Sequence, residues 1–173
     1  MSVLLLADAK THLNITVTTY DVELQSKIDS AEAVIARRCG PLSSVATTSR
    51  VRGGGDALLL TTSPAVSLTS VTPVGGSALT LTDLYLDTVA AVVTYDLGGT
   101  FGSGAYTVVY QAGRATVPLD LMEGIKELLR HLWSNSQRGG ARRGGADMVN
   151  PATYLLPYEV QSLIEPHLQP GFA

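Results

Sequence analysis

Three histidines and one cysteine are the residues of this chain best suited to bind a metal ion or to act as a base and a nucleophile. His12, His131 and His167 stand far apart, and none has helical spacing to another histidine or to Cys39. Zinc sites usually need paired ligands at short spacing, so the sequence predicts no metal centre. A thiolate nucleophile at Cys39 would need a base beside it, and the sequence favours a small apolar residue at a helix end instead.

The glycine-rich stretches do not have the spacing of a phosphate-binding loop. A P-loop needs G-x-x-x-x-G-K-[ST], and none of the lysines, Lys10, Lys27 and Lys126, follows a glycine. Residues 99–104 read G-x-x-G-x-G, which is the wrong order for a dinucleotide fingerprint, and no helix is expected after them. No G-x-S-x-G nucleophile motif occurs. The sequence therefore predicts no catalytic residue, no cofactor and no enzymatic activity.

A run of arginines and glycines is the segment that most favours a binding role. Residues 130–143 contain four arginines and no acid, a local charge of +4, and subtracting this from the net charge of −3 leaves −7 for the remaining residues. Guanidinium groups bind carboxylates and phosphates in a forked geometry. The alternative is a hydrated loop without a partner. We predict a contact with another protein through residues 138–145 and the C-terminal segment, with these residues: Arg138, Arg142, Arg143, Tyr154 and Tyr158.

Composition indicates a compact folded protein. The 173 residues suffice for one domain. Hydrophobic residues make up 45% and charged residues 16%, against roughly 25% charged residues in an average protein, which excludes an intrinsically disordered chain. The longest apolar run, residues 3–7, is far shorter than the ~20 residues of a membrane helix, so no membrane contact is predicted. A single cysteine excludes an internal disulfide and suits a reducing compartment such as a cytoplasm.

Two amphipathic helices are predicted in the first forty residues. An apolar stripe over residues 6–13 predicts the first helix, with Asn14 as its stop. The second helix begins with capping residues near Asp21 and ends at Gly40, which is followed by a proline. Its apolar residues fall on one face, and the core residues predicted there are Leu24, Ile28 and Ile35.

Between Val45 and Ala112 the pattern changes to short β-rich runs separated by glycine and proline turns. Residues 106–110, YTVVY, have the β-branched and aromatic content of a strand. The predicted strands are Ser49–Arg52, Ala57–Thr61, Ser67–Thr72, Tyr85–Leu86, Val92–Tyr95 and Ala105–Gln111.

A third helix is predicted from Pro118 onward, with acidic residues near its start. Gly124 is its one poor helix former, and a close contact with another helix would explain this glycine. A short final helix is predicted over Tyr158–Ile164, closed by Pro166. The core residues predicted on the third helix are Leu121, Ile125, Leu128, Leu132 and Trp133.

Three stretches carry a resemblance to a known family. Residues 6–15, LADAKTHLNI, look like its opening helix. Residues 106–113, YTVVYQAG, followed by VPLDL at 117–121, look like its last strand running into a long helix. Residues 156–166, LPYEVQSLIEP, are similar to its C-terminal segment. In these stretches the chain resembles the head–tail connector, or adaptor, proteins of long-tailed bacteriophages, although its β-rich middle is longer than in the nearly all-helical members.

The resemblance implies an α+β protein: a helical connector fold of three to four helices with one small antiparallel β-sheet inserted between the second and third helices. The chain would then be a single connector domain, 1–173. Its expected parts are the N-terminal helices (1–40), the β-rich insertion (45–112), the long core helix (117–137), the Gly/Arg loop (138–150) and the C-terminal docking segment (151–173).

The resemblance also implies a structural role in a virion. Family members form a closed ring of about twelve copies beneath the portal protein. The ring extends the channel through which double-stranded DNA passes without specific binding, and offers a docking surface for the next neck, stopper or tail protein. This implies a protein of the head–tail junction that is assembled in the cytoplasm of a bacterial host.

Two other classes remain open. One is a different neck component, a stopper or tail-completion protein, although such proteins place more of their chain in β structure. The other is a small nucleic-acid-binding module that uses the arginine run. That class needs basic residues spread over a face, whereas the chain outside residues 130–143 is acidic.

Overall fold

The computed structural model describes residues 2–139 and 156–169, which form two compact units. The helical unit consists of Met1–Arg38 and Val117–Leu168. The β-rich unit consists of Cys39–Thr116 and, among the described residues after it, Gln169. Among the described residues no helix is both long and apolar enough to cross a membrane.

Four α-helices build the helical unit, and their bounds confirm the helices predicted from the sequence. Asn14 adopts a left-handed conformation (φ 56°) after α1, which ends that helix as its position predicted. The last helix is followed by a 3₁₀ turn, η3. The elements are α1 (Leu6–Leu13), α2 (Asp21–Cys39), α3 (Leu119–Gly139), α4 (Tyr158–Ile164) and η3 (Glu165–His167).

The core of the helical unit lies along the apolar faces of α2, α3 and α4. Leu128 is 4% exposed, while Leu132 and Trp133, one turn further along α3, are half-buried. The Trp133 ring meets Tyr20 edge-to-face, with 5.6 Å between the ring centroids. The fully buried apolar side chains are Ala9, Leu24, Ile28, Ala31, Ile35, Leu121, Ile125, Leu129, Val160 and Ile164.

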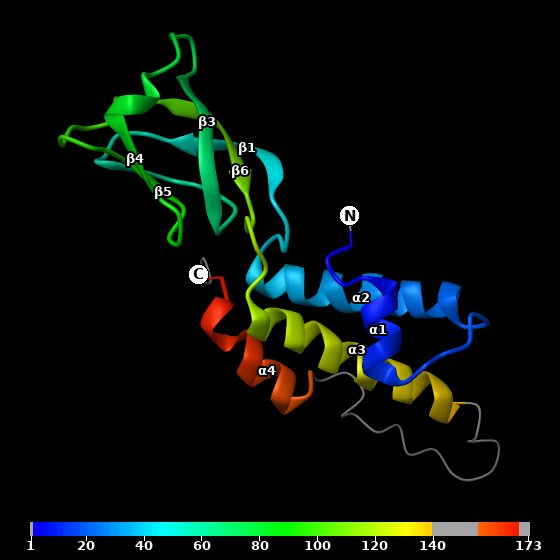
Figure 1. Ribbon diagram of the computed structural model, residues 1–173. Helices are drawn as coiled ribbons and strands as arrows, with labels where there is room; N and C mark the ends of the chain where they lie inside the picture. Colours follow the sequence, from blue (N-terminus) through cyan, green and yellow to red (C-terminus); the bar gives the residue numbers. More distant parts are fainter. Residues whose placement is uncertain (1, 140–155, 170–173) are drawn as a thin grey trace. The chain divides into compact units, whose positions relative to one another are not determined.

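Gly124 lies where α4 packs against α3 (Figure 1). A Cβ atom built on this glycine would stand 3.3 Å from Ile164 Cγ2 and 3.7 Å from Leu163 Cβ. The absence of a side chain therefore lets the two helices approach closely. This confirms the helix contact that the glycine predicted.

The N-terminal segment is fixed to α2 by one carboxylate. Glu32 Oε1 accepts hydrogen bonds at 2.8 Å from the backbone N–H groups of Val3 and Leu4 and from the Ser2 hydroxyl. Leu4 is 2% exposed. Three donors converging on one charged oxygen hold this segment in place, because charge-assisted hydrogen bonds are the strong ones.

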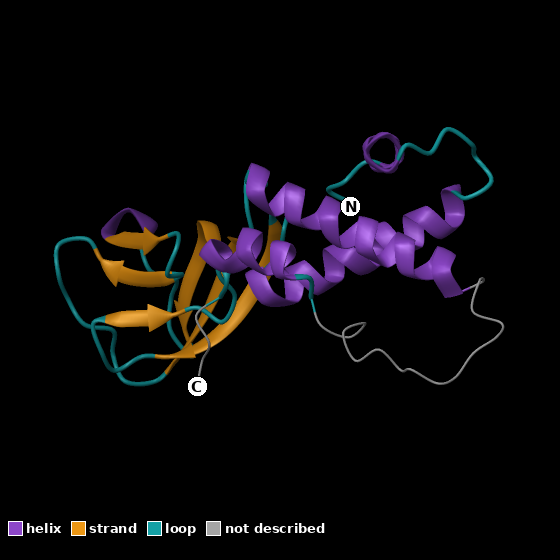
Figure 2. Ribbon diagram, turned by 90° about the horizontal axis from the view of Figure 1, so that it is seen from below, coloured by secondary structure: helices purple, strands orange, loops and turns teal. Residues whose placement is uncertain are grey.

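Six strands build the β-rich unit, in two antiparallel sheets of three strands each (Figure 2). The first sheet has the order β1-β6-β3 and the second β2-β5-β4. Each predicted strand overlaps one of them. Their bounds are β1 (Val45–Arg52), β2 (Ala57–Leu59), β3 (Ala65–Pro73), β4 (Leu84–Asp87), β5 (Val92–Tyr95) and β6 (Ala105–Ala112), with a 3₁₀ turn η1 (Leu81–Asp83) before β4.

The inward rows of both sheets enclose one hydrophobic core. Along β6 buried and half-buried residues alternate without a break, which is the period of a strand with one face in a core. Tyr110 is fully buried in that core. Its hydroxyl lies 3.1 Å from Ser49 Oγ and from the Thr62 backbone nitrogen, and 3.2 Å from the Thr62 carbonyl oxygen. These partners satisfy a polar group that would otherwise be costly to bury.

The fold class expected from the sequence is therefore wrong. It placed one small sheet inside a helical connector fold, whereas the chain forms two three-stranded sheets with a core of their own, in a unit distinct from the helices. The physical reason is burial. Leu58, Val93 and Leu86 form one inward row across the second sheet, and this row is covered only because it packs into the same core as the first sheet.

Candidate partner interface

The histidines of the chain each have a different neighbour. His12 Nε2 lies 3.7 Å from Glu127 Oε1, His131 Nε2 lies 3.0 Å from the Asn135 side-chain nitrogen, and Cys39 is fully buried. Within residues 2–139 and 156–169, no group of three or more His, Cys, Asp or Glu side chains could hold a metal ion. The described part of the chain thus offers no cluster of this kind for a metal ion.

The third histidine connects the C-terminal 3₁₀ turn of the helical unit to the start of α3. His167 Nε2, in η3, lies 2.6 Å from Asp120 Oδ2, in the first turn of α3. This hydrogen bond is the main reason that the pKa of Asp120 is lowered below its usual value. The bond also brings the neighbouring exposed residues Leu119 (87% exposed) and Leu168 (46%) to the same end of the helical unit.

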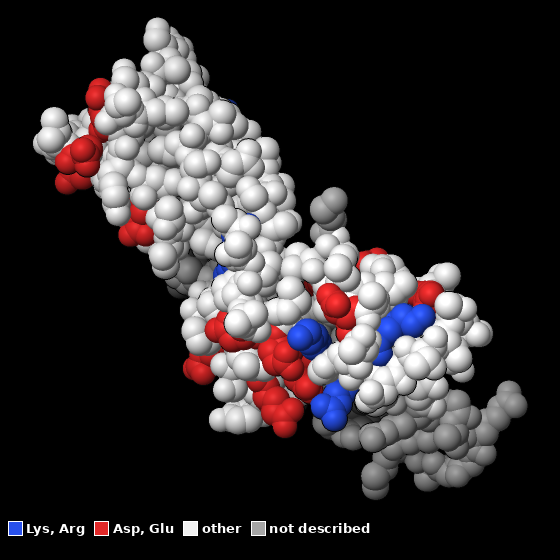
Figure 3. All heavy atoms as spheres, viewed as in Figure 1, with Lys and Arg blue, Asp and Glu red and all other residues white. Residues whose placement is uncertain are grey.

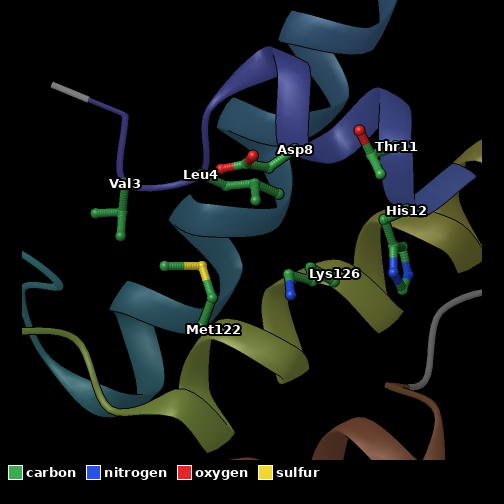
Figure 4. A pocket seen from close by; sticks show the side chains of 7 residues that line it. All are labelled: Val3, Leu4, Asp8, Thr11, His12, Met122 and Lys126. Atoms are coloured by element: carbon green, nitrogen blue, oxygen red, sulfur yellow. The ribbon is translucent and has the colours of Figure 1, made fainter. Parts of the chain in front are cut away.

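A hollow of about 400 Å³ opens between the N-terminal segment, α1 and α3. Figure 4 shows apolar side chains on one side of it, polar ones on the other, and Asp8 and Lys126 between them. Lys126 Nζ is itself bound to Glu123 Oε2 at 3.2 Å. The hollow thus mixes apolar and charged groups. Its lining is Val3, Leu4, Asp8, Thr11, His12, Met122 and Lys126.

Of the five residues predicted to contact a partner, the structure describes the side chain of Tyr158. Arg142, Arg143 and Tyr154 lie outside the described residues, and so does the side chain of Arg138, whose backbone belongs to the last turn of α3. Arg130, which begins the basic run, is bound to Glu127 on its own helix at 3.2 Å. Part of the local positive charge is therefore offset on α3 itself.

Tyr158 is the first residue of α4 and is 84% exposed. Pro157 precedes the helix with an extended conformation (φ −53°, ψ 143°), and its carbonyl accepts the first helical hydrogen bond, from the Gln161 backbone at 3.0 Å. The Gln161 side chain donates back to the Leu156 carbonyl at 2.6 Å. These bonds fix the start of α4 and therefore the position of Tyr158.

Tyr158 lines a hollow of about 330 Å³ on the helical unit, together with an arginine of α2. Arg38 lies in the last turn of α2, where the helix dipole favours a cation. Its place beside α4 could not be predicted, because the contact joins segments over a hundred residues apart. The lining residues are Arg38, Tyr158, Gln161, Ser162, Ile164, Glu165 and Leu168.

No family model and no curated protein matches the chain. Three solved structures share its fold. A chain in the "Neck of native GTA particle computed with C12 symmetry" is 21% identical, with a TM-score of 0.63, and the alignment covers 97% of this chain and 90% of that one. The fold is that of a gene transfer agent neck protein.

The two other structures give the same result. A chain in the "Neck of empty GTA particle computed with C6 symmetry" is 20% identical, with a TM-score of 0.63 over 98% of this chain and 91% of that one. A chain in the "Virion of native gene transfer agent (GTA) particle" is 21% identical, with a TM-score of 0.65 over the same shares. The likeness thus covers nearly the whole of both chains.

Proposed function

We propose that this chain is a structural protein of a virion neck and acts as the head–tail adaptor. The observation that carries the proposal is the likeness in fold to neck proteins over 97–98% of the chain. One of those necks was computed with twelvefold symmetry. A heterologous contact repeated around such an axis closes into a ring. We therefore propose a ring of about twelve copies at the head–tail junction.

The proposed ring binds the portal on one side and a neck, stopper or tail protein on the other. Its channel lets double-stranded DNA pass without specific binding. The acidic balance of the chain, −3 overall, supports this part of the proposal, because affinity for DNA rises mainly with the number of phosphates that cations neutralise. Assembly takes place in the host cytoplasm, and the chain needs no catalytic group for this work.

We assign the portal contact to the Gly/Arg loop (138–150) and the start of α4. Tyr158 is exposed beside Arg38, and an exposed tyrosine near an arginine is a common composition for a protein interface. Arg138, Arg142, Arg143 and Tyr154 belong to the same proposal through their sequence. A neighbouring copy is the second candidate for this contact.

The first experiment measures the mass of the purified chain by light scattering over a range of concentrations, with electron microscopy of the same fractions. A closed ring with a central hole supports the adaptor. If the chain is monomeric alone, mixing it with the portal protein of the same particle should produce the ring. A chain that stays monomeric with the portal but binds preformed adaptor rings is a stopper. A small dimer with salt-dependent affinity for short DNA would contradict the proposal and favour the nucleic-acid-binding module.

The contact assignment is tested with two variants. The triple variant Arg138→Ala/Arg142→Ala/Arg143→Ala and the single variant Tyr158→Ala should fold normally and bind the portal more weakly. Arg130→Ala is the matched control, because this arginine is paired with Glu127 on its own helix. Unchanged portal binding by both test variants would show that the contact lies elsewhere.

A further inference from the structure

The two sheets of the β-rich unit present outward faces of different chemistry. Both sheets turn their inward rows to one core. Their outward rows therefore point to solvent on opposite sides of that core, since successive residues of a strand alternate between faces.

The outward face of the first sheet is polar and basic. Arg50 and Arg52 of β1 are exposed and lie opposite Thr107 and Ala105 of β6. The rest of this outward face comes from small or uncharged side chains, and no acidic residue lies on β1, β3 or β6. Those further outward residues are Ala46, Thr48, Ser67, Ser70, Thr72, Val109 and Gln111. We call this surface face A.

The outward face of the second sheet is apolar and has an acidic margin. Leu59 of β2 is 60% exposed and Tyr85 of β4 is 57% exposed, and Ala57, Val92 and Thr94 complete their two rows. Asp87 ends the row that contains Leu59, and it accepts hydrogen bonds from Val89 and Ala90 at 2.9 Å. We call this surface face B.

Basic and acidic residues of the β-rich unit gather at different sheets. From Gly53 to Gly113 the sequence contains four aspartates and no lysine, arginine or histidine. Three of these acids, Asp56, Asp83 and Asp96, directly flank the strands of the second sheet, and the fourth is Asp87 within β4. In Figure 3 acidic side chains of the β-rich unit stand at its outer margin, with hardly any basic atom on the face in view. Among the strand residues, the cations Arg50 and Arg52 thus lie on face A, and the one acid, Asp87, lies in an outward row of face B.

We propose that face A of one copy binds face B of the next copy. Each face supplies what the other lacks: guanidinium groups pair with carboxylates and stack on aromatic rings, and Leu59 and Tyr85 offer apolar area that is otherwise exposed. Two different faces on one unit make a heterologous contact, and such a contact generates a ring when its rotation closes. The proposal rests on the proposed ring and names the surfaces that join its copies. The Gly/Arg loop and Tyr158 are then left to bind the portal.

The test uses charge reversal across the contact. Arg50→Glu/Arg52→Glu alters face A, and Tyr85→Lys alters face B. Each variant should raise the concentration needed for ring assembly, or for assembly on the portal, by about tenfold or more, because like charges then oppose each other. The three substitutions combined in one chain should restore assembly, because the new acids of one copy face the new lysine of the next.

The matched control is Val22→Lys, which adds the same charge at an exposed residue of α2 in the helical unit, outside both faces. It should assemble like the wild type and should not restore the Arg50→Glu/Arg52→Glu variant. Thermal unfolding of each variant checks that the exposed substitutions leave the fold intact.

The possible results separate this inference from the function on which it rests. Normal assembly of either face variant, or loss in both without restoration in the combined chain, would overturn the pairing of faces A and B and leave the neck function standing. A wild-type chain that forms no ring, alone or with the portal, would overturn the proposed function and with it this contact.

Discussion

His167 Nε2 lies 2.6 Å from Asp120 Oδ2, and this hydrogen bond joins residues 47 positions apart. It links η3, at the end of α4, to the first turn of α3. Asp120 Oδ1 also accepts a hydrogen bond from the Leu121 backbone at 2.9 Å. One carboxylate therefore binds both its own helix start and the C-terminal segment.

The Asp120–His167 bond predicts a pH-dependent effect of Asp120→Asn. The hydrogen bond to His167 lowers the pKa of Asp120 in the folded state, so the stabilisation is complete above the unfolded pKa of about 4. It is lost as the pH falls through the lower folded value. At pH 7 the variant should lose up to about 1 kcal/mol in free energy of unfolding, because a carboxylate that is 41% exposed is partly screened.

Urea denaturation at several pH values measures this effect. The difference between wild type and Asp120→Asn should shrink as the pH falls below about 4, since both side chains are then neutral. Glu159→Gln, which removes an exposed charge from α4, is the control. A difference of the same size at pH 7 and pH 2.5 would show that the hydrogen bond between the Asp120 carboxylate and His167 does not cause it.

The α3–α4 contact predicts different effects of two substitutions at Gly124. Gly124→Leu should destabilise the helical unit by about 1–3 kcal/mol, because a large side chain cannot fit beside Ile164. Gly124→Ala adds a Cβ only 3.3 Å from Ile164 Cγ2, and the gain of about 1 kcal/mol in helix propensity offsets this crowding. The midpoint of chemical unfolding should therefore fall strongly for Leu and little for Ala. Equal, small changes for both would mean that α4 does not pack there.

The local elements could be predicted from the sequence because their signals are local. Asn14 and Gly40 end helices through their backbone conformation, with φ angles of 56° and 81°. Such a stop depends on the type of a single residue, so the sequence shows it directly. Gly124 likewise predicted a helix contact, although the sequence around it does not indicate that the partners are Leu163 and Ile164. Periodicity tells which side chains share a face, and says nothing of what covers that face.

The arrangement of the strands and the candidate interface required the structure. Buried and exposed residues alternate along a strand in the same way whether the strands form one sheet or two. The pairing of β6 with both β1 and β3 therefore could not be predicted from the sequence. The hollow beside Tyr158 depends on Arg38, which lies far away in sequence. The aspartates between residues 53 and 113 are visible in the sequence, but their relation to Arg50 and Arg52 follows only from the two outward faces.

The buried hydroxyl of Tyr110 predicts a loss of stability in Tyr110→Phe. The substitution removes a hydrogen-bond partner within 3.2 Å from the Thr62 backbone groups and from Ser49 Oγ, although Ser49 Oγ keeps its bond to the Thr61 hydroxyl. Unpaired buried polar groups cost about 1–3 kcal/mol each, and we expect a total near the lower end because water can reach the half-buried Thr62. Tyr85→Phe is the control, because Tyr85 is 57% exposed. Equal unfolding midpoints of the two variants would contradict a structural role for the Tyr110 hydroxyl.

The apolar face of α3 predicts that Leu128→Ala is strongly destabilising in the isolated chain. Leu128 is 4% exposed, and truncating a buried leucine typically costs about 2–5 kcal/mol through lost burial and the cavity left behind. Leu119→Ala on the same helix is the matched control: its side chain is 87% exposed, so its thermal midpoint should stay close to that of the wild type. Calorimetry on dilute, monomeric samples separates burial within one chain from burial on assembly. A Leu128→Ala midpoint equal to that of Leu119→Ala would mean that this face is covered only when copies assemble.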